Sequence, residues 1–395
     1  MYRNKPETNR APEALQVYLD SNDYSNFSDP KKRDLPSFRD TKNRLKKLVS
    51  DGKIIIRHSM ISVIEAAPLN RSDIQTAGLR FSCIKELCGK STLINPFDLL
   101  ENELKILASC STPYSILLSN GHWMPPLDDI KIPNPKVMLS DEISKLQLNR
   151  QQRRAAKKIV EGSYKDKAGE QEALELARQI PVNKPALIAL RKYMAGDSPK
   201  SKVIDALKDS FSDLDLWERI YYDYWDSASS ASAWLRTQGG KLDAMLNEFS
   251  ASIKGLYGAA ELNGIPESDV KRLARAANKN NRNKFFSDIS HKLAENFEIN
   301  LPSGTLPTWE KSPGLYTLIA LYFEKLKEKS LDLRASSSGK ISDFGDIMHA
   351  IYLPYVDIFR CDKATANLIR RAIPQCGVFI PANLNDLILG IEERV

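Results

Sequence analysis

The sequence lacks any long apolar segment. None of its hydrophobic runs approaches the roughly 18 residues that a helix needs to cross a bilayer. Its first residues, MYRNKPETNRAPE, contain no apolar stretch of the kind that a secretory signal requires. These absences argue against an integral membrane protein and predict a cytoplasmic one, with no membrane partner.

Cysteine is scarce, and several familiar motifs are missing. The five cysteines are an odd number without a CxxC pair, which disfavours both a disulfide framework and a zinc site. GxGxxG, GxxxxGK[ST], GxSxG and HExxH do not occur, which argues against nucleotide-driven enzymes, serine hydrolases and zinc proteases. We expect thiols buried in the core at Cys83, Cys88, Cys110, Cys361 and Cys376.

What is present is an ordinary globular composition with an excess of positive charge. The 395 residues are 42% hydrophobic and 27% charged, and the formal net charge is +7. The length predicts two structural units rather than one. The charge favours an anionic partner such as nucleic acid.

The order of predicted elements divides the chain into two α/β parts and a helical middle. Strands are expected at 15–19, 53–59, 91–95, 355–361 and 376–382, and amphipathic helices lie between them. Strands that alternate with helices indicate a parallel sheet. We therefore predict an α/β fold in which residues 13–135 and 311–395 form one parallel-sheet domain, interrupted by an all-α domain at 136–310.

Four acidic residues follow predicted strands or stand in the helices after them. They are Asp20 after the first strand, Glu65 in the helix after the second, Asp346 near the start of a helix, and Asp362 after the strand at 355–361. The carboxyl ends of parallel strands share one edge of a sheet, where ligands bind. Asp20, Asp346 and Asp362 can also be explained as cap or turn residues. Glu65 stands in an apolar helix, where an unpaired carboxylate is costly.

Carboxylates gathered at one edge need a counter-charge. At about 4 Å a like-charged pair costs roughly 4 kcal/mol at an effective dielectric constant near 20. Because histidines are few and no cysteine is suitably placed, we expect an all-oxygen site for Mg²⁺ or Mn²⁺. Such ions activate water and hold phosphate oxygens, which is the chemistry of metal-dependent nucleases.

Three stretches resemble the successive motifs of PIN-like domain nucleases: VYLDSNDYS, IIIRHSMISVIEAAP and SDFGDIMHAIYLPYVDIFRCDK. The resemblance covers roughly residues 13–110 and 310–395 and does not explain the helical middle. It implies Asp20, Glu65, Asp346 and Asp362 as catalytic, metal-binding acids, with Asn22 supporting the first and Asp357 as an accessory acid or as an alternative to Asp362. Family members are typically metal-dependent endoribonucleases, some of them toxins or parts of defence systems. A protein regulator or antitoxin is therefore implied as a partner.

His349 follows Asp346 by one helical turn. Three interpretations stay open for this residue: a contact for a phosphate, an orienting partner for the acid, or a packed polar side chain.

Basic residues concentrate in two stretches of the helical middle, RQQRRAAKK and KRLARAANKNNRNK. On a helix the second stretch forms a stripe that fits either a phosphate backbone or a solvated face. The residues expected to contact nucleic acid are Arg150, Arg153, Arg154, Lys157, Lys271, Arg272, Arg275, Lys279 and Arg282.

Aromatic residues cluster between Trp217 and Trp234. They fit either stacking on bases or a helix–helix core.

The sequence thus predicts a Mg²⁺- or Mn²⁺-dependent nuclease, with RNA favoured over DNA as its substrate. One alternative is a catalytically silent PIN-like scaffold whose helical domain binds nucleic acid or protein. Another is a DNA nuclease. Whether the chain forms a homo-oligomer stays open.

Overall fold

The computed structural model describes residues 14–68, 70–110, 114–124, 182–194, 197–223, 262–331 and 343–395, with short pieces between 149 and 155 and between 237 and 260. This part of the chain is a mixed α/β structure in which helices predominate. No helix in it combines the length and the apolar character that crossing a membrane requires.

A three-stranded parallel sheet lies at the centre of the α/β part. β1 (Leu15–Tyr18) is the middle strand, with β2 (Ile54–Arg57) on one side and β5 (Ile358–Phe359) on the other. Because β5 comes from the far end of the sequence, both ends of the chain build one sheet. The predicted α/β class is confirmed at this level.

Three of the predicted strands, at 91–95, 355–361 and 376–382, are much shorter than expected. β5 keeps only two residues of 355–361, and 376–382 contributes only an isolated bridge from Phe379 to Ile358. Gly377 and Pro381 bound the apolar run, and proline cannot donate a hydrogen bond to a strand ladder. The expectation of a full last strand was therefore wrong.

A second pair of short strands adjoins the sheet. β3 (Thr92–Leu93) pairs antiparallel with β4 (Leu117–Leu118), a strand that the sequence pattern did not predict. The buried guanidinium of Arg57 joins the two sheets, because its Nε donates to Gln16 Oε1 at 2.6 Å and its Nη1 to the Thr92 carbonyl at 3.1 Å.

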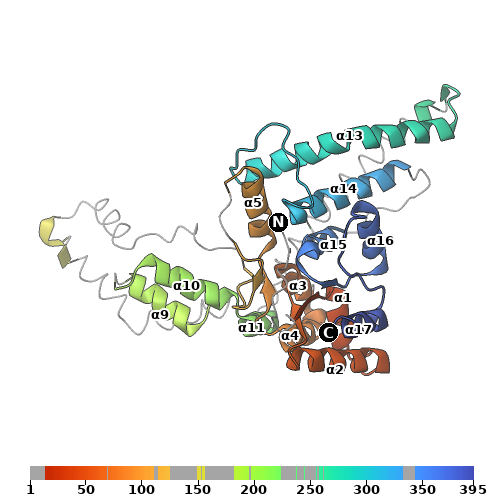
Figure 1. Cartoon of the computed structure of the whole chain (residues 1–395). Helices are drawn as coiled ribbons and strands as arrows, with labels where there is room; N and C mark the ends of the chain where they lie inside the picture. Colours follow the sequence, from red (N-terminus) through yellow and green to blue (C-terminus); the bar gives the residue numbers. More distant parts are fainter. Residues whose placement is uncertain are drawn as a thin grey trace, which may run out of the picture.

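Helices surround the central sheet (Figure 1). The first part of the chain forms α1 (Ser21–Ser28), α2 (Pro36–Ser50), α3 (Met60–Ala66), α4 (Ile74–Cys88) and α5 (Pro96–Leu107). The middle forms α9 (Lys184–Met194), α10 (Lys200–Phe211), α11 (Leu214–Asp223) and α13 (Glu267–Asn296), and the last part forms α14 (Pro313–Leu331), α15 (Asp343–Ala350), α16 (Lys363–Ala372) and α17 (Leu384–Glu392).

The sheet separates two hydrophobic cores. Val17 and Tyr18 are neighbours on β1, and both are fully buried. Val17 packs in the core that contains residues of α1, α2, α4 and α17, whereas Tyr18 packs with residues of α5, α14, α15 and α16. Successive side chains of a strand point to opposite faces. Both faces of β1 are therefore covered, as parallel sheets require.

The aromatic segment of the helical middle belongs to the core of the α/β part. Tyr221 meets the ring of Phe81 edge-on at 4.6 Å, and Trp217 lies 5.7 Å from Trp123. α11 thus packs on α4, and the helix–helix core is the use observed for Trp217 and Tyr221. Tyr224, Trp225 and Trp234 lie outside the described residues.

The rest of the described middle divides between two other groups. α13 lies along α14, where Phe286 and Phe323 are 6.4 Å apart (Figure 1). α9 and α10 pack together around Val182 and Ala186. Two helices of the segment predicted as one inserted domain, 136–310, therefore pack on the α/β part: α11 and α13.

Burial of the cysteines follows the expectation only in part. Cys83, Cys88 and Cys361 are buried, Cys376 is half-buried, and Cys110 is exposed. The expectation was wrong for Cys110, which stands beyond the end of α5.

A buried carboxylate joins α5 to the start of α14. Glu103 is 0% exposed, and its two oxygens accept the backbone N–H groups of Gly314 and Leu315 at 2.9 and 2.5 Å. The hydroxyl of Tyr355 also donates to it. These contacts satisfy backbone donors that a helix start leaves without partners. Gly314 is suited to its place because a Cβ there would lie 3.2 Å from Glu103 Oε1.

We predict that Glu103→Gln lowers stability by about 1–3 kcal/mol, because one buried N–H loses its acceptor. Burial raises the pKa of Glu103 to about 7, against the pull of Tyr355 and the two N–H groups. Its contribution to the free energy of unfolding is therefore complete below the ordinary pKa and is lost as the pH rises through about 7. The difference between wild type and variant should be larger at pH 5 than at pH 8 in urea unfolding.

The control is Glu101→Gln, on the exposed side of the same helix, where Glu101 pairs with Lys105. It should change stability by less than about 0.5 kcal/mol at either pH. A Glu103→Gln effect that did not vary with pH would contradict the proposed burial of a titrating carboxyl.

Candidate active site

The carboxyl ends of β1 and β5 each lead into a helix capped by an aspartate. Asp20 is the N-cap of α1, and its Oδ1 accepts the backbone N–H of Asn22 at 3.5 Å. Asp362 is the N-cap of α16 and accepts the backbone N–H of Thr365 at 2.6 Å. The two strands are parallel neighbours, so their ends lie at one edge of the sheet. Both aspartates therefore serve as caps and also stand where the acids are expected to gather.

The charges of the other three predicted acids affect the pKa of Asp346, on α15. Its pKa is raised to about 7, first by burial and then by the charge of Asp20. The charges of Glu65 and Asp362 act in the same direction. Burial also raises the pKa of Asp20, and the charge of Glu65 adds to that effect. Because salt largely screens exposed charges that are more than about 8 Å apart, mutual influence of this kind requires proximity.

His349 lies inside this group of acids. It is 4% exposed, and its Nε2 is 3.0 Å from Glu65 Oε2 and 3.1 Å from Ser21 Oγ. Burial alone would lower the pKa of His349, but its neighbours Tyr18 and Glu65 outweigh burial and hold that pKa well above the ordinary value. The ring is therefore a buried cation, and it orients the carboxylate of Glu65.

A chain of hydroxyl groups extends from the other ring nitrogen. His349 Nδ1 lies 2.5 Å from Tyr18 Oη, which in turn lies 2.7 Å from Ser59 Oγ. Because the charged ring donates from both nitrogens, Tyr18 accepts from His349 and donates toward Ser59. Tyr18 was missed in the sequence, where it looked like one more strand residue. The contact ties β1, α3 and α15 together behind the acids.

The pKa of Glu65 depends on its contact with His349. Burial works to raise its pKa, yet the adjacent His349 holds that pKa below the ordinary value. Glu65 is therefore ionised, and the sequence-based expectation that it needs a partner in an apolar helix is met by His349.

A buried ion pair beside Asp20 was also missed in the sequence. Asp23 is 1% exposed, and Nη2 of Arg360 lies 3.4 Å from its Oδ1. Burial raises the pKa of Asp23 to about 7, and the charge of Arg360 opposes that rise. The available signal was position, because Arg360 directly follows β5 and so stands at the same edge of the sheet as Asp20.

Two residues implied by the resemblance do not join the acids through their side chains. Asp357 precedes β5, and its Oδ2 accepts the backbone N–H of Gln16 at 2.8 Å, toward the other edge of the sheet. Asn22 is exposed and touches Asp20 through its backbone. Of the two candidates for the fourth acid, Asp362 is the one at the carboxyl edge.

The basic residues expected to contact nucleic acid are placed in different ways. The guanidinium of Arg282 stacks on the ring of Phe286 at 4.5 Å and donates to Tyr316 Oη at 2.8 Å, so it lies in the contact between α13 and α14 instead of in an outward stripe. Arg272 forms an exposed ion pair with Asp269 at 3.2 Å. Lys271 is half-buried, and Arg150 and Arg154 are exposed, whereas Arg153, Lys157 and the side chains of Arg275 and Lys279 lie outside the described residues.

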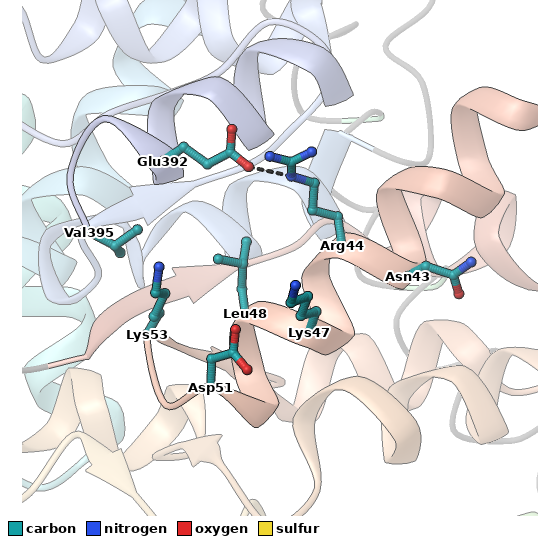
Figure 2. A pocket seen from close by; sticks show the side chains of 8 residues that line it. All are labelled: Asn43, Arg44, Lys47, Leu48, Asp51, Lys53, Glu392 and Val395. Carbon is teal, nitrogen blue, oxygen red and sulfur yellow. Dashed lines mark hydrogen bonds and ion pairs between the residues drawn. The ribbon is translucent and has the colours of Figure 1, made fainter.

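A hollow of about 600 Å³ lies between α2 and α17 (Figure 2). It is lined by Asn43, Arg44, Lys47, Leu48, Asp51, Lys53, Glu392 and Val395. Lys53 directly precedes β2, so the hollow lies toward the amino edge of the sheet. Arg44 and Glu392 form an ion pair there. None of the predicted acids lines it.

The donors at the acidic edge suit a hard divalent cation in their chemistry. Within the described residues, no group of three or more His, Cys, Asp or Glu side chains is close enough to hold a metal ion without rearrangement. Asp346 nevertheless accepts no hydrogen bond from a described residue, and Asp20 accepts only the long one from Asn22. Buried carboxylates with like-charged neighbours and few donors are the ones that a cation stabilises most.

No protein-family model, curated protein or solved structure matches the chain. What the site can do is therefore inferred from its own geometry. That geometry places carboxylate oxygens beside a buried histidine and a half-buried arginine.

We predict that His349→Phe costs about 2–3 kcal/mol of stability, because it leaves the Glu65 carboxylate without its cation beside two other acids. Glu65→Gln should cost less, since the remaining imidazolium still faces Asp20. The double variant His349→Phe/Glu65→Gln should lose less than the sum of the two single losses. Urea unfolding of the four proteins measures this coupling.

The matched control is His122→Phe, which removes a histidine from an exposed pair with Asp209 at 2.7 Å. It should cost below about 1 kcal/mol. Strictly additive effects at Glu65 and His349 would show that their contact is not energetically coupled.

Proposed function

We propose that this chain is a divalent-metal-dependent nuclease with a PIN-like architecture that hydrolyses phosphodiester bonds in RNA. The observation that carries the proposal is the pKa of Asp346, which rises to about 7 through burial and through the charges of Asp20, Glu65 and Asp362. Three of the four acids chosen from the sequence thus influence the carboxyl of the fourth. The resemblance of three sequence stretches to PIN-like nucleases supports the same residues and favours RNA.

Asp20, Glu65, Asp346 and Asp362 would hold one or two Mg²⁺ or Mn²⁺ ions. Bound ions of this kind supply a Lewis acid for phosphate oxygens and a more acidic water. The protein's own contribution is orientation: the α1 cap holds Asp20, and His349 fixes the direction of Glu65. Rigid placement of ligands by surrounding hydrogen bonds is what a metal site requires.

The charges at the acidic edge suit an anionic substrate only once cations have bound. Against four acids stand the buried cation His349 and the half-buried Arg360, so the edge is negative until cations bind. A phosphodiester would be repelled by the acids alone. Metal binding and substrate binding are therefore expected to depend on each other.

We predict that Asp20→Asn and Asp346→Asn each lower Mg²⁺-dependent cleavage of a generic single-stranded RNA by at least about 100-fold. Removing one member of a group of repelling, buried carboxylates should leave the metal-free protein as stable as wild type, or up to roughly 2 kcal/mol more stable at pH 8. Cleavage assays on denaturing gels and urea unfolding of the same preparations test both parts.

Asp51→Asn, an exposed acid at the end of α2, is the control and should change neither quantity. A parallel single-stranded DNA substrate separates an RNase from a DNase. Binding of RNA without cleavage under Mg²⁺ or Mn²⁺ would favour a catalytically silent scaffold and contradict the proposal. Loss of activity accompanied by unfolding of both aspartate variants would remove the support for a catalytic role.

A further inference from the structure

Arg80, on α4, is a half-buried cation that makes no hydrogen bond or ion pair with the described residues. Its Nε is buried and makes no hydrogen bond, and no other described residue forms a hydrogen bond or ion pair with its guanidinium. Ala77 and Ile84, one turn away on either side, are 0% and 1% exposed. Arg80 therefore stands on a side of α4 that faces the interior.

This arrangement is unfavourable unless something binds there. A guanidinium carries five N–H donors, and burying the one at Nε without an acceptor is unfavourable. The terminal nitrogens of Arg80 are not among the buried atoms, so a ligand can reach them. Among the buried groups without partners in the described residues, the only other arginine nitrogen is Nε of Arg360. Arg360 already pairs with Asp23, whereas Arg80 feels the charges of Asp73 and Glu65 without forming an ion pair with either.

Arg80 is near the acidic edge. The charge of Glu65 acts on the pKa of Arg80, and the charge of Arg80 acts on the pKa of Glu65. The two nevertheless do not form an ion pair, because Glu65 is held by His349. Glu65 is therefore already engaged, and it leaves Arg80 without an ion pair.

We propose that Arg80 binds a phosphate of the nucleic-acid strand that lies at the acidic edge. Guanidinium and phosphate match in a bidentate geometry, and a phosphate would supply the acceptors that Arg80 lacks. Arg80 would hold the strand on the α4 side of Glu65, while the acids hold the cations. The inference rests on the proposed function for the identity of the strand, but its test does not require cleavage.

Steady-state cleavage with Mg²⁺ gives the first test, comparing wild type with Arg80→Gln, Arg80→Lys and the control Arg71→Gln. Arg71 is exposed and lies on the turn before α4. Because Arg80→Gln would lose a charge-assisted hydrogen bond to the phosphate, we predict a roughly 10–100-fold lower kcat/KM, caused mostly by a higher KM. The kcat/KM of Arg80→Lys should lie between these values, because lysine keeps the charge but not the bidentate geometry of the guanidinium. The kcat/KM of Arg71→Gln should stay within about twofold of wild type.

Binding gives the second test and is independent of catalysis. Fluorescence polarisation of a labelled 12-nucleotide single-stranded RNA is measured in the Asp346→Asn background with Mg²⁺ at several KCl concentrations. Adding Arg80→Gln should weaken binding about tenfold or more and reduce the salt slope by about 1. If wild type does not cleave RNA but this difference is present, the proposed function fails and the role of Arg80 stands.

Stability separates binding from a structural role. Because Arg80 has no partner to lose, Arg80→Gln should be at least as stable as wild type in urea. A clearly lower urea midpoint for Arg80→Gln with unchanged RNA binding would assign Arg80 to packing and overturn the proposal. Displacement of the RNA by 10 mM inorganic phosphate in the Asp346→Asn protein, but not after Arg80→Gln is added, would assign the site to free phosphate and overturn it too.

Discussion

Carboxylates that lie half-buried beside one another repel, and this repulsion shapes the carboxyl edge of the central sheet. Asp20 and Asp346 are both pushed toward their protonated forms, first by burial and then by charge. The chain offsets part of this cost internally with two cations, His349 on Glu65 and Arg360 on Asp23. The acids exceed these cations in number, so the site remains short of positive charge. The divalent ion that we propose would supply it.

The fold holds these groups in place through contacts that span the sequence. β5 joins β1 in the sheet although it comes from the far end of the chain. Glu103 ties α5 to the start of α14, and Tyr18 reaches from β1 to His349 on α15. On the other face of the sheet, α11 contributes Tyr221 to the core that contains Val17. The helical middle thus supports the α/β part directly as well as extending from it.

Much of the acidic edge could be predicted from the sequence because strand ends and helix caps are local features. Asp20 and Asp362 follow apolar runs and begin helices, so their positions depend on neighbours within a few residues. The partners of His349 could not be predicted, since Tyr18 reaches it only through the tertiary fold. Arg282 looked like one member of an outward stripe, but its aromatic neighbours on two helices drew it inward. A short pattern such as residues 376–382 failed for a different reason, because proline limited its pairing.

The measurement that tests the central claim most directly is a crystal structure of the protein soaked with Mn²⁺, recorded at a wavelength where manganese scatters anomalously. We predict an anomalous peak at the carboxyl edge of the sheet, about 2.1 Å from carboxylate oxygens of Asp20 and Asp346, in keeping with oxygen ligands of small divalent ions. Absence of manganese there, with Asp20 and Asp346 instead paired to arginine or lysine side chains, would contradict the account.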